Sequence, residues 1–300
     1  TGTHLNPFDT VSVEHMTRNE QIAFKVDAML AQAGASAAEA GSNFSEVDQS
    51  LVQRCTELAF QKAAERGDNL PPTLQDFYDA ANEQPEEQAQ VIALRYERFV
   101  KGSMNFFNHQ SNVDFNPRIV YFNLKDLPDS MLVFALINVC EAVRNRMYFN
   151  AKRNVRTWFY VEEMQSMFAY PTVLNYFSRF SNEGRKFGLL LTGISQNATA
   201  MLANEAARNI VLNADFLMLL KQSPLDRMKW AELLNLSEQE EECIDESAEP
   251  GDGLLIAGNA RVPIRGKFPS GNVLYDLFST NPNETKKTGL GDKKDAKPVI

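Results

Sequence analysis

Residues 157–163 read Thr157-Trp158-Phe159-Tyr160-Val161-Glu162-Glu163, a β-branched and aromatic run that ends in two adjacent carboxylates. Strands of a parallel sheet have this composition when both of their faces are covered, so we expect a buried parallel strand here. Acids at the carboxyl end of such a strand lie at the edge where α/β sheets bind ligands. In P-loop ATPases one acid at this place faces magnesium, and a second acid can orient the attacking water. A strand that simply ends in solvent would carry acids too, so these residues alone leave both interpretations open.

The composition indicates a large folded protein of a reducing compartment. The chain has 300 residues, of which 44% are hydrophobic, and its net charge of −9 disfavours broad nonspecific binding to nucleic acid. The three cysteines are far apart and form no CxxC pair, and the three histidines are scattered, so neither a disulfide framework nor a zinc site is expected. No apolar run is long enough to span a membrane, and no signal peptide is visible.

The first third of the chain carries the start signals of several helices. A capping-box pattern occurs at Thr17/Glu20, and the pairs Ser45/Asp48 and Thr73/Asp76 mark two further helix starts, each followed by apolar residues. Pro85 indicates the start of a fourth helix that ends near residue 102. We therefore expect residues 17–103 to be all-helical, with a loop in the alanine-rich stretch at 34–41.

After Pro117 the pattern changes to strands that alternate with helices. We expect strands at 118–124, 157–163, 188–196 and 216–220, with helices between them at 129–146, 171–182 and 199–212. This alternation predicts βαβ units and a parallel sheet. Two helices, at 225–234 and 237–244, and a hairpin at 253–264 follow. The polar, lysine-rich residues from 281 onward are expected to be disordered.

Polar side chains follow three successive strands of this predicted sheet. The paired glutamates end one strand, Gln196 ends the next, and Lys221-Gln222 follows the third. Each could be an ordinary strand exit, but one crevice would collect an acid, an amide and an amine if the strands are neighbours.

Arg185 and Lys186 lie between a predicted helix and the strand that leads to Gln196. Adjacent cations there could stabilise phosphate charge across a subunit boundary, as an arginine finger does. Cations that favourably end a helix are the simpler explanation, and these residues alone favour it.

The phosphate-binding loop GxxxxGK[ST] is not found in the 300 residues. The only Gly-Lys pair, Gly266-Lys267, has Arg261 in place of the first glycine and Phe268 in place of Ser or Thr. Without that loop, we expect these residues alone to hold nucleotide weakly or not at all. We interpret the chain as a fragment, with this loop lying before Thr1.

The order and spacing of the motifs resemble the carboxyl-terminal ATPase domain of the conjugal-transfer ATPases of type IV secretion systems. The resemblance extends to about Pro282 and rests on residues 6–9, 158–163, 185–188, 196, 221–222 and 251–255. It implies a RecA-like P-loop NTPase core with a largely parallel sheet, formed by residues 1–16 and 104–281. It also implies an inserted helical subdomain at 17–103, and residues 282–300 remain as a flexible tail.

The same resemblance implies a function and a set of roles. ATP hydrolysis would drive channel assembly or substrate transfer, with ATP and Mg²⁺ as cofactors. Glu162 would hold Mg²⁺ through its water shell, Glu163 would polarise the attacking water, and Gln196 would sense the γ-phosphate. Lys221 and Gln222 would contact the nucleotide. Arg185, assisted by Lys186, would reach the nucleotide of a neighbouring subunit, which implies a homo-oligomer, a hexamer by analogy.

One departure leaves other functions open. Glu162 stands where the family usually has Asp, and the extra methylene moves the carboxylate by about 1.5 Å, which magnesium tolerates badly. A catalytically weakened structural component of the secretion machine is therefore one alternative, and a motor that translocates DNA directly is another. Partners would be secretion proteins at the inner membrane and possibly DNA, and the expected location is the cytoplasm, peripheral to the membrane.

Overall fold

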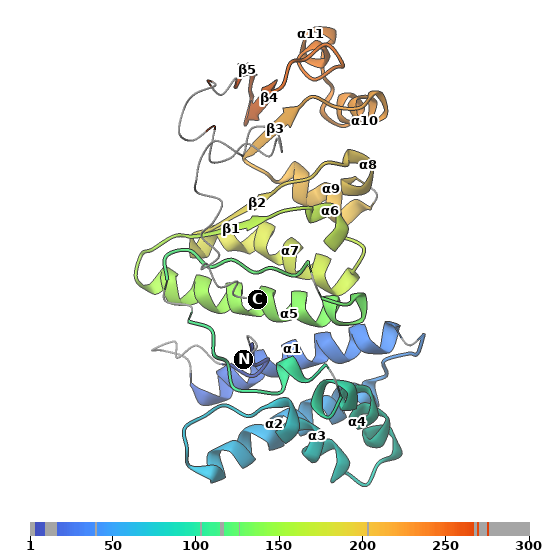
Figure 1. Cartoon of the computed structure of the whole chain (residues 1–300), viewed down its shortest axis with the longest axis vertical. Coiled ribbons are helices and arrows are strands. Elements are labelled where there is room, and N and C mark those ends of the chain that lie inside the picture. Colours follow the sequence, from blue (N-terminus) through green and yellow to red (C-terminus); the bar gives the residue numbers. More distant parts are fainter. Residues whose placement is uncertain are drawn as a thin grey trace.

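A computed structural model of the chain describes residues 4–9, 17–39, 41–102, 104–114, 117–125, 127–202, 204–266, 269 and 275. Helices and sheets form successive layers along its longest axis (Figure 1). The amino-terminal helices lie at one end, the long helix α5 (Asp129–Lys152) crosses the middle, and the strands follow beyond it. The described helices include none that is both long enough and apolar enough to span a bilayer.

The helical region begins where its capping residues predict. Its helices are α1 (Arg18–Glu39), α2 (Glu46–Arg66), α3 (Leu74–Asn82) and α4 (Glu87–Val100), followed by the short η1 (Asn105–Phe107). At the two further predicted starts, Ser45 and Thr73 form capping boxes with Asp48 and Asp76. Thr17 donates to the Glu20 carboxylate in the same way. These local hydrogen bonds satisfy amides that the first helical turn leaves without partners.

The loop expected at 34–41 is wrong for most of that stretch, because α1 continues to Glu39. Alanine has the highest helix propensity, and a single glycine costs a helix only about 1 kcal/mol. Ala33 and Ala37 are buried on this part of α1. Packing of the alanine face therefore outweighs the glycine, and the helix ends before Gly41, whose φ of 66° is left-handed.

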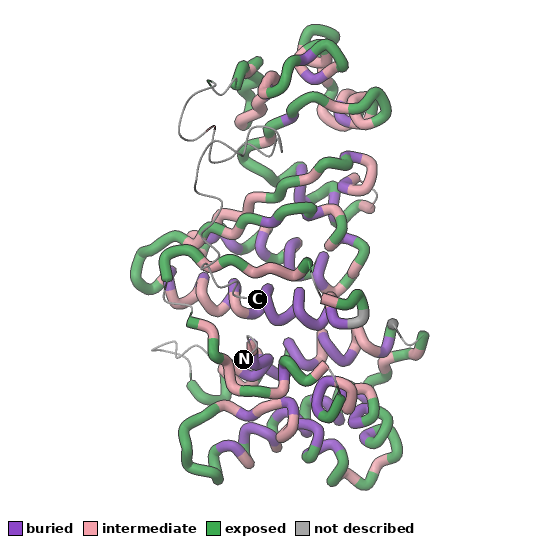
Figure 2. Tube along the Cα trace, viewed as in Figure 1, coloured by how far each residue is buried: buried purple, intermediate pink, exposed green. Residues whose placement is uncertain are grey.

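Two hydrophobic cores meet at α5. One contains buried residues of α1 to α4 together with Phe8 and with Met131 and Phe134 of α5. The other contains Val133, Leu136, Ile137 and later residues of α5 and extends to the strands. Figure 2 shows buried positions along α5 and on the helices to either side. The domain boundaries at 16/17 and 103/104 stay a prediction, although the two cores agree with a helical unit that packs on a strand-containing one.

A buried charged cluster joins α1 to α5 and α7 (Pro171–Glu183). Its centre is Glu141, which is 3% exposed and accepts hydrogen bonds from Arg144 (2.7 Å) and from the Tyr176 hydroxyl (2.8 Å). Lys25, also 3% exposed, lies 4.0 Å from the same carboxylate and donates to the Pro7 carbonyl at 3.1 Å. Burial lowers the pKa of Lys25, against the opposing charge of Glu141. We call these four side chains, Lys25, Glu141, Arg144 and Tyr176, the Glu141 cluster.

The strand that carries the paired glutamates pairs in parallel with the next strand, as predicted. Strand β1 (Thr157–Val161) aligns Thr157 with Leu189 and Val161 with Gly193 of β2 (Leu189–Gly193). Helices α5 and α7 cover one face of this pair, where Phe159 stacks on Phe177 with ring centroids 6.1 Å apart. The pair thus places both strand ends at the same edge.

The other face of β1 is exposed, which corrects the expectation of a strand covered on both sides. Trp158 and Tyr160 are 61% and 59% exposed and stack on each other at 5.7 Å. The strand expected at 118–124 is also wrong: residues 117–125 contain no strand, and Ile119 is 84% exposed. An apolar alternating run becomes a strand only beside a partner, and within the described ranges no strand pairs with it.

The third predicted strand, β3 (Phe216–Leu220), exists but lies in a separate sheet. It pairs antiparallel with β4 (Asp252–Ala257), which pairs antiparallel with β5 (Ala260–Arg265). The β4–β5 hairpin is the one expected around Gly258. Helices α10 (Pro224–Leu234) and α11 (Glu238–Glu242) accompany this sheet. Among the described strands β3 is therefore no neighbour of β2, and the parallel arrangement is limited to β1 and β2.

Asp9 gives the stability a pH dependence that can be measured. Burial raises the pKa of its carboxyl above 3.8, against the hydrogen bond from Ser111 and the charge of Lys25. The folded state therefore holds this proton more tightly, and the contribution to stability is lost as the pH rises through the raised pKa. We expect wild type to lose stability relative to Asp9→Asn as the pH rises above the ordinary carboxyl pKa of 3.8, measured by urea unfolding.

The matched control for Asp9 is Asp27→Asn, because Asp27 is exposed on α1. Parallel curves for wild type and Asp9→Asn would contradict the prediction.

Candidate functional site

The backbone at the ends of β1 and β2 is held together beyond the last paired residues. The Ile194 amide donates to the Val161 carbonyl at 2.9 Å, and the Met164 amide donates to the Ile194 carbonyl at 3.0 Å. The chain segment that contains Glu162 and Glu163 is thereby fixed against the segment that leads from β2 to Gln196. The predicted convergence of these two strand ends is what the structure shows.

Glu163 adopts a left-handed backbone conformation, with φ 50° and ψ 38°. A non-glycine residue in this region costs about 1–3 kcal/mol, so it persists only where the surroundings impose it. The Ser166 amide and hydroxyl both donate to the Glu163 carbonyl, at 2.9 and 2.7 Å. The turn directs the Glu163 side chain toward the end of β2, where Gln196 lies.

Gly193 is the residue that lets this turn pack closely on β2. A Cβ atom at position 193 would lie 2.2 Å from the Met164 sulfur, so any larger residue would displace that side chain. Met164 follows Glu163 directly and is 2% exposed. Its burial beneath the turn anchors the strained residue.

Two side-chain amides bracket the Glu163 carboxylate. The Gln196 Nε2 donates to Oε1 and the Gln165 Nε2 donates to Oε2, each at 2.5 Å. The sequence predicted the meeting of Gln196 with the glutamate pair, but it did not single out Gln165. The only signal for Gln165 is an amide two residues after the acid pair, in a short helix α6 (Met164–Met167) that the sequence did not predict.

Glu162 is exposed and precedes the strained residue. A single exposed carboxylate fits the way Mg²⁺ is usually bound, since this ion keeps several waters and takes one or two carboxylates together with substrate phosphates. Within the described residues no group of three or more His, Cys, Asp or Glu side chains could form an all-protein cage. The donor chemistry thus agrees with a water-mediated role for Glu162.

Arg185 and Lys186 lie on the short helix η2 (Gly184–Phe187), between α7 and β2. The Arg185 Nη2 donates to both carboxylate oxygens of Asp215, at 2.9 and 3.0 Å. Both side chains are largely exposed, 81% and 61%. Lys186 is exposed as well. The structure therefore engages Arg185 with an acid that the sequence did not single out, at the start of β3 and apart from Glu163.

Lys221 and Gln222 follow β3 and contact α10 and the turn after α11. Lys221 donates to the Glu246 carbonyl, and Gln222 accepts from the Trp230 Nε1 at 3.2 Å. The Gln222 backbone N–H also donates to the Ile244 carbonyl at 2.8 Å. In the structure these two residues fasten β3 to its own helices, and their side chains do not join Glu163 and Gln196.

The carboxyl ends of β2 and β3 nevertheless point toward the same side of the molecule (Figure 1). The helix after β2, α8 (Ala198–Met201), is tied to the start of α10, because the Thr199 amide donates to the Asp226 carboxylate at 3.0 Å. Burial raises the pKa of Asp226, but hydrogen bonds from Ser223 and Thr199 outweigh it, so the net pKa is lowered. An ionised Asp226 thus links the two strand exits.

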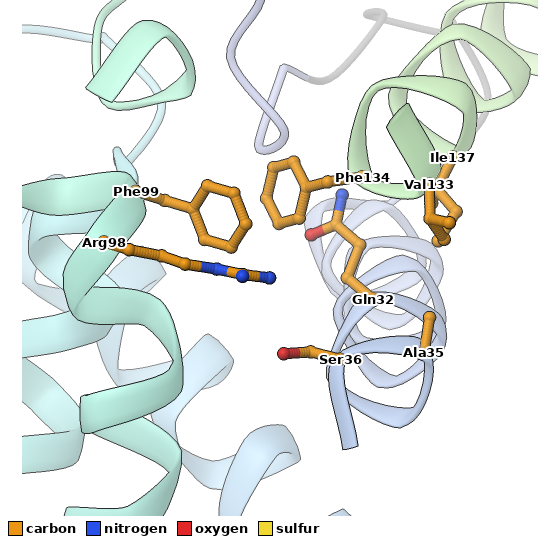
Figure 3. Close-up of a pocket in the computed structure, with 8 residues that line it drawn as sticks. All are labelled: Gln32, Ala35, Ser36, Arg98, Phe99, Val133, Phe134 and Ile137. Carbon is orange, nitrogen blue, oxygen red and sulfur yellow. The ribbon is translucent and has the colours of Figure 1, made fainter. Parts of the chain in front are cut away.

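A separate hollow lies on the far side of α5 from the strands, between α1, α4 and α5. The Gln32 amide and the Arg98 guanidinium point into it, beside Phe99 and Phe134 (Figure 3). It contains none of the residues that the motifs single out. The candidate site is therefore the exposed edge at the strand ends and not this hollow.

No family model and no curated protein matches the chain, whereas solved structures do match it. The structure of VirB4 of Thermoanaerobacter pseudethanolicus superimposes with a TM-score of 0.72, at 18% identity, over 89% of this chain and 74% of that one. The chain has the VirB4 fold. The α/β, RecA-like architecture predicted from the motifs is thereby confirmed.

Conjugative coupling proteins also match, with lower scores. The plasmid coupling protein TrwB in complex with ADP and Mg²⁺ covers 90% of this chain and 75% of its own, at 14% identity and a TM-score of 0.47. Its score is too low to support an argument about residues. Similarity to VirB4 itself, at 18% identity, establishes the fold and leaves the chemistry to the geometry of the site.

Proposed function

We propose that the chain forms the ATP-hydrolysing domain of a motor in a type IV secretion or conjugation system. The observation that carries the proposal is the contact between Glu163 and Gln196 at the ends of two parallel strands. On the VirB4 fold, this is the edge at which α/β proteins bind ligands. The motif resemblance is the basis for proposing the type IV secretion family. The contact between Glu163 and Gln196 is the basis for proposing that these two residues take part in catalysis.

Glu163 is proposed to take the proton of the attacking water, and Gln196 to contact the γ-phosphate. In the structure these side chains bond to each other, so the arrival of a phosphate would offer the Gln196 amide a charged acceptor in place of Glu163. Gln165 would continue to hold the other carboxylate oxygen and keep it directed at the water. In-line phosphoryl transfer depends mainly on such positioning and on charge stabilisation.

Glu162 is proposed to hold Mg²⁺ through its water shell, and the ion would neutralise charge on the transferred phosphate. A glycine-rich phosphate loop is not found in the 300 residues, so the proposal requires that this part be supplied from outside them. Lys221 and Gln222 stay proposed nucleotide contacts, because β3 ends on the same side as β2. They would have to exchange their bonds to Glu246 and Trp230.

Arg185, with Lys186 assisting, is proposed to reach the nucleotide of a neighbouring subunit. Its exposure of 81% supports a role outside its own subunit, since an approaching surface can reach an exposed guanidinium. The role requires a homo-oligomer, for which we propose a hexamer. The proposed location is the cytoplasmic face of the membrane, held by secretion proteins, with DNA as a further candidate partner.

Two alternatives stay open, and the first has a specific observation behind it. Glu162 in place of the family's Asp favours a structural component with weakened catalysis. A motor acting directly on DNA is the second, although the net charge of −9 disfavours it. Salt-dependent binding of DNA by the assembled protein would support that alternative.

The test is Mg²⁺-dependent ATP hydrolysis by the whole protein, compared with Gln196→Ala. We expect the variant to lose on the order of 10-fold in kcat, because one hydrogen bond to a charged group contributes about 1.5 kcal/mol. Gln239→Ala is the matched control, since Gln239 is an exposed amide on α11. Equal rates for wild type and Gln196→Ala, or hydrolysis by neither, would contradict the proposal.

A further inference from the structure

We propose that Asp215 is a resting-state partner of Arg185, which a phosphate must displace before Arg185 can act. The inference rests on the proposed function, in which Arg185 stabilises phosphate charge. It adds a residue that the motifs did not indicate and a reason why the cation is inactive in an isolated subunit. We call the contact the Arg185–Asp215 pair.

The pair occupies one of the guanidinium nitrogens that would bind phosphate. The Arg185 Nη2 donates to both carboxylate oxygens of Asp215, at 2.9 and 3.0 Å. Carboxylates and phosphates present similar pairs of oxygens to a guanidinium, so the two compete for the same donors. Asp215 therefore fixes the orientation of the guanidinium. While the pair is intact, the Nη2 nitrogen is not available to a second anion.

The pair fastens the turn that carries Arg185 to the turn before β3. Asp215 immediately precedes β3, and Arg185 lies on η2 before β2. A second contact runs alongside, from the Asn213 Nδ2 to the Asn182 Oδ1 at 3.1 Å. The neutral contact between Asn213 and Asn182 can hold the two turns together while Arg185 exchanges Asp215 for a phosphate.

Exposure makes the pair exchangeable. Its side chains are 81% and 61% exposed, and ion pairs in such surroundings are worth little because water and salt screen them. A phosphate carries more charge than a carboxylate and offers more acceptor oxygens, so it would displace Asp215 at modest cost. The pair can thus hold the cation before phosphate binds, but it is too weak to serve as a permanent structural contact.

The experiment is steady-state ATP hydrolysis by the whole assembled protein at low ionic strength. We expect Asp215→Asn to raise kcat by about 1.5- to fivefold, the range that an exposed ion pair would account for, with KM for ATP unchanged. A change in kcat alone identifies an interaction that matters in the transition state, which a loss of stability would not produce. High salt should reduce the gain, because salt already loosens the pair in wild type.

Three further variants make the test specific. Asp215→Glu keeps a carboxylate and should return kcat toward that of wild type. Asp27→Asn makes the same charge change at an exposed site on α1 and should leave kcat unaltered. In an Arg185→Ala background, Asp215→Asn should have no effect.

A rise that persists without Arg185, or an unchanged or lower kcat in Asp215→Asn, would overturn the inference. Failure of the proposed function is a different result, namely no hydrolysis in any variant including wild type. A double-mutant cycle on urea unfolding, with Arg185→Ala and Asp215→Ala, tests the contact without ATP. It should give a coupling of about 1.5- to fivefold in the unfolding equilibrium, and no coupling would overturn the pair itself.

Discussion

Glu163→Gln should abolish nearly all ATP hydrolysis by the whole protein while nucleotide binding persists. We expect kcat to fall by about 10²- to 10⁴-fold, the usual contribution of a positioned general base. The substitution keeps the size and shape of the side chain but removes the group that accepts a proton from water. Because Glu163 is exposed and its carboxylate contacts only Gln165 and Gln196 among the described residues, folding should be little affected.

The measurement pairs a hydrolysis assay with the binding of a non-hydrolysable ATP analogue. Glu232→Gln is the matched control, since it makes the same change at an exposed position of α10. A kcat within about threefold of wild type would remove Glu163 from the mechanism and favour the structural component. Loss of analogue binding would instead indicate that the variant had disturbed the site.

The sequence predicted most helices of the fold, because their signals are local. Ser45 and Asp48 predict a helix start, and α2 begins there with a capping box that satisfies backbone amides within a single turn. The loop expected at 34–41 is wrong because the helix propensity and burial of the alanines outweigh the effect of Gly34. Their burial against the rest of the helical region is a tertiary effect that local patterns do not carry.

Strand partners were harder to predict than strands. β1, β2 and β3 lie where the apolar runs predicted, but β3 pairs antiparallel with β4 instead of joining the parallel sheet. Residues 118–124 have the alternation of a strand and form none, with Ile119 left exposed. Pairing depends on which edges are available in three dimensions, and the pattern of one segment contains no information about them.

The sequence predicted only part of the candidate site, again because the pattern of one segment does not specify its neighbours in three dimensions. Parallel strands end at one edge, so Glu163 and Gln196 could be expected to meet, and they do. Gln165 and Asp215 could not be expected, because their roles come from the strained turn at Glu163 and from the approach of η2 to β3. Contacts of this kind depend on packing and have no spacing rule in the sequence.

Glu141→Ala should destabilise the protein by about 3–5 kcal/mol, the cost of breaking a buried ion pair by removing one partner. The Glu141 carboxylate is the acceptor for Arg144 and Tyr176 and the nearest counter-charge of Lys25. Its removal leaves two buried cations without compensation, and Lys25 is almost fully buried at 3% exposure. Urea unfolding followed by circular dichroism would measure the loss, with Glu232→Ala on exposed α10 as the control, expected within about 0.5 kcal/mol of wild type.

Two milder variants keep the prediction testable if Glu141→Ala does not fold. Tyr176→Phe removes one hydroxyl donor and should cost about 1.5–3 kcal/mol, the range for a hydrogen bond to a charged group. Glu141→Gln keeps the shape but not the charge, so its cost should lie between those of the other two. Losses below about 1 kcal/mol for all three would show that water reaches the cluster and compensates the cations. Because Lys25 lies on α1 and Glu141 on α5, such an opening would also mean that the helical region is not firmly held to the layer that carries the strands.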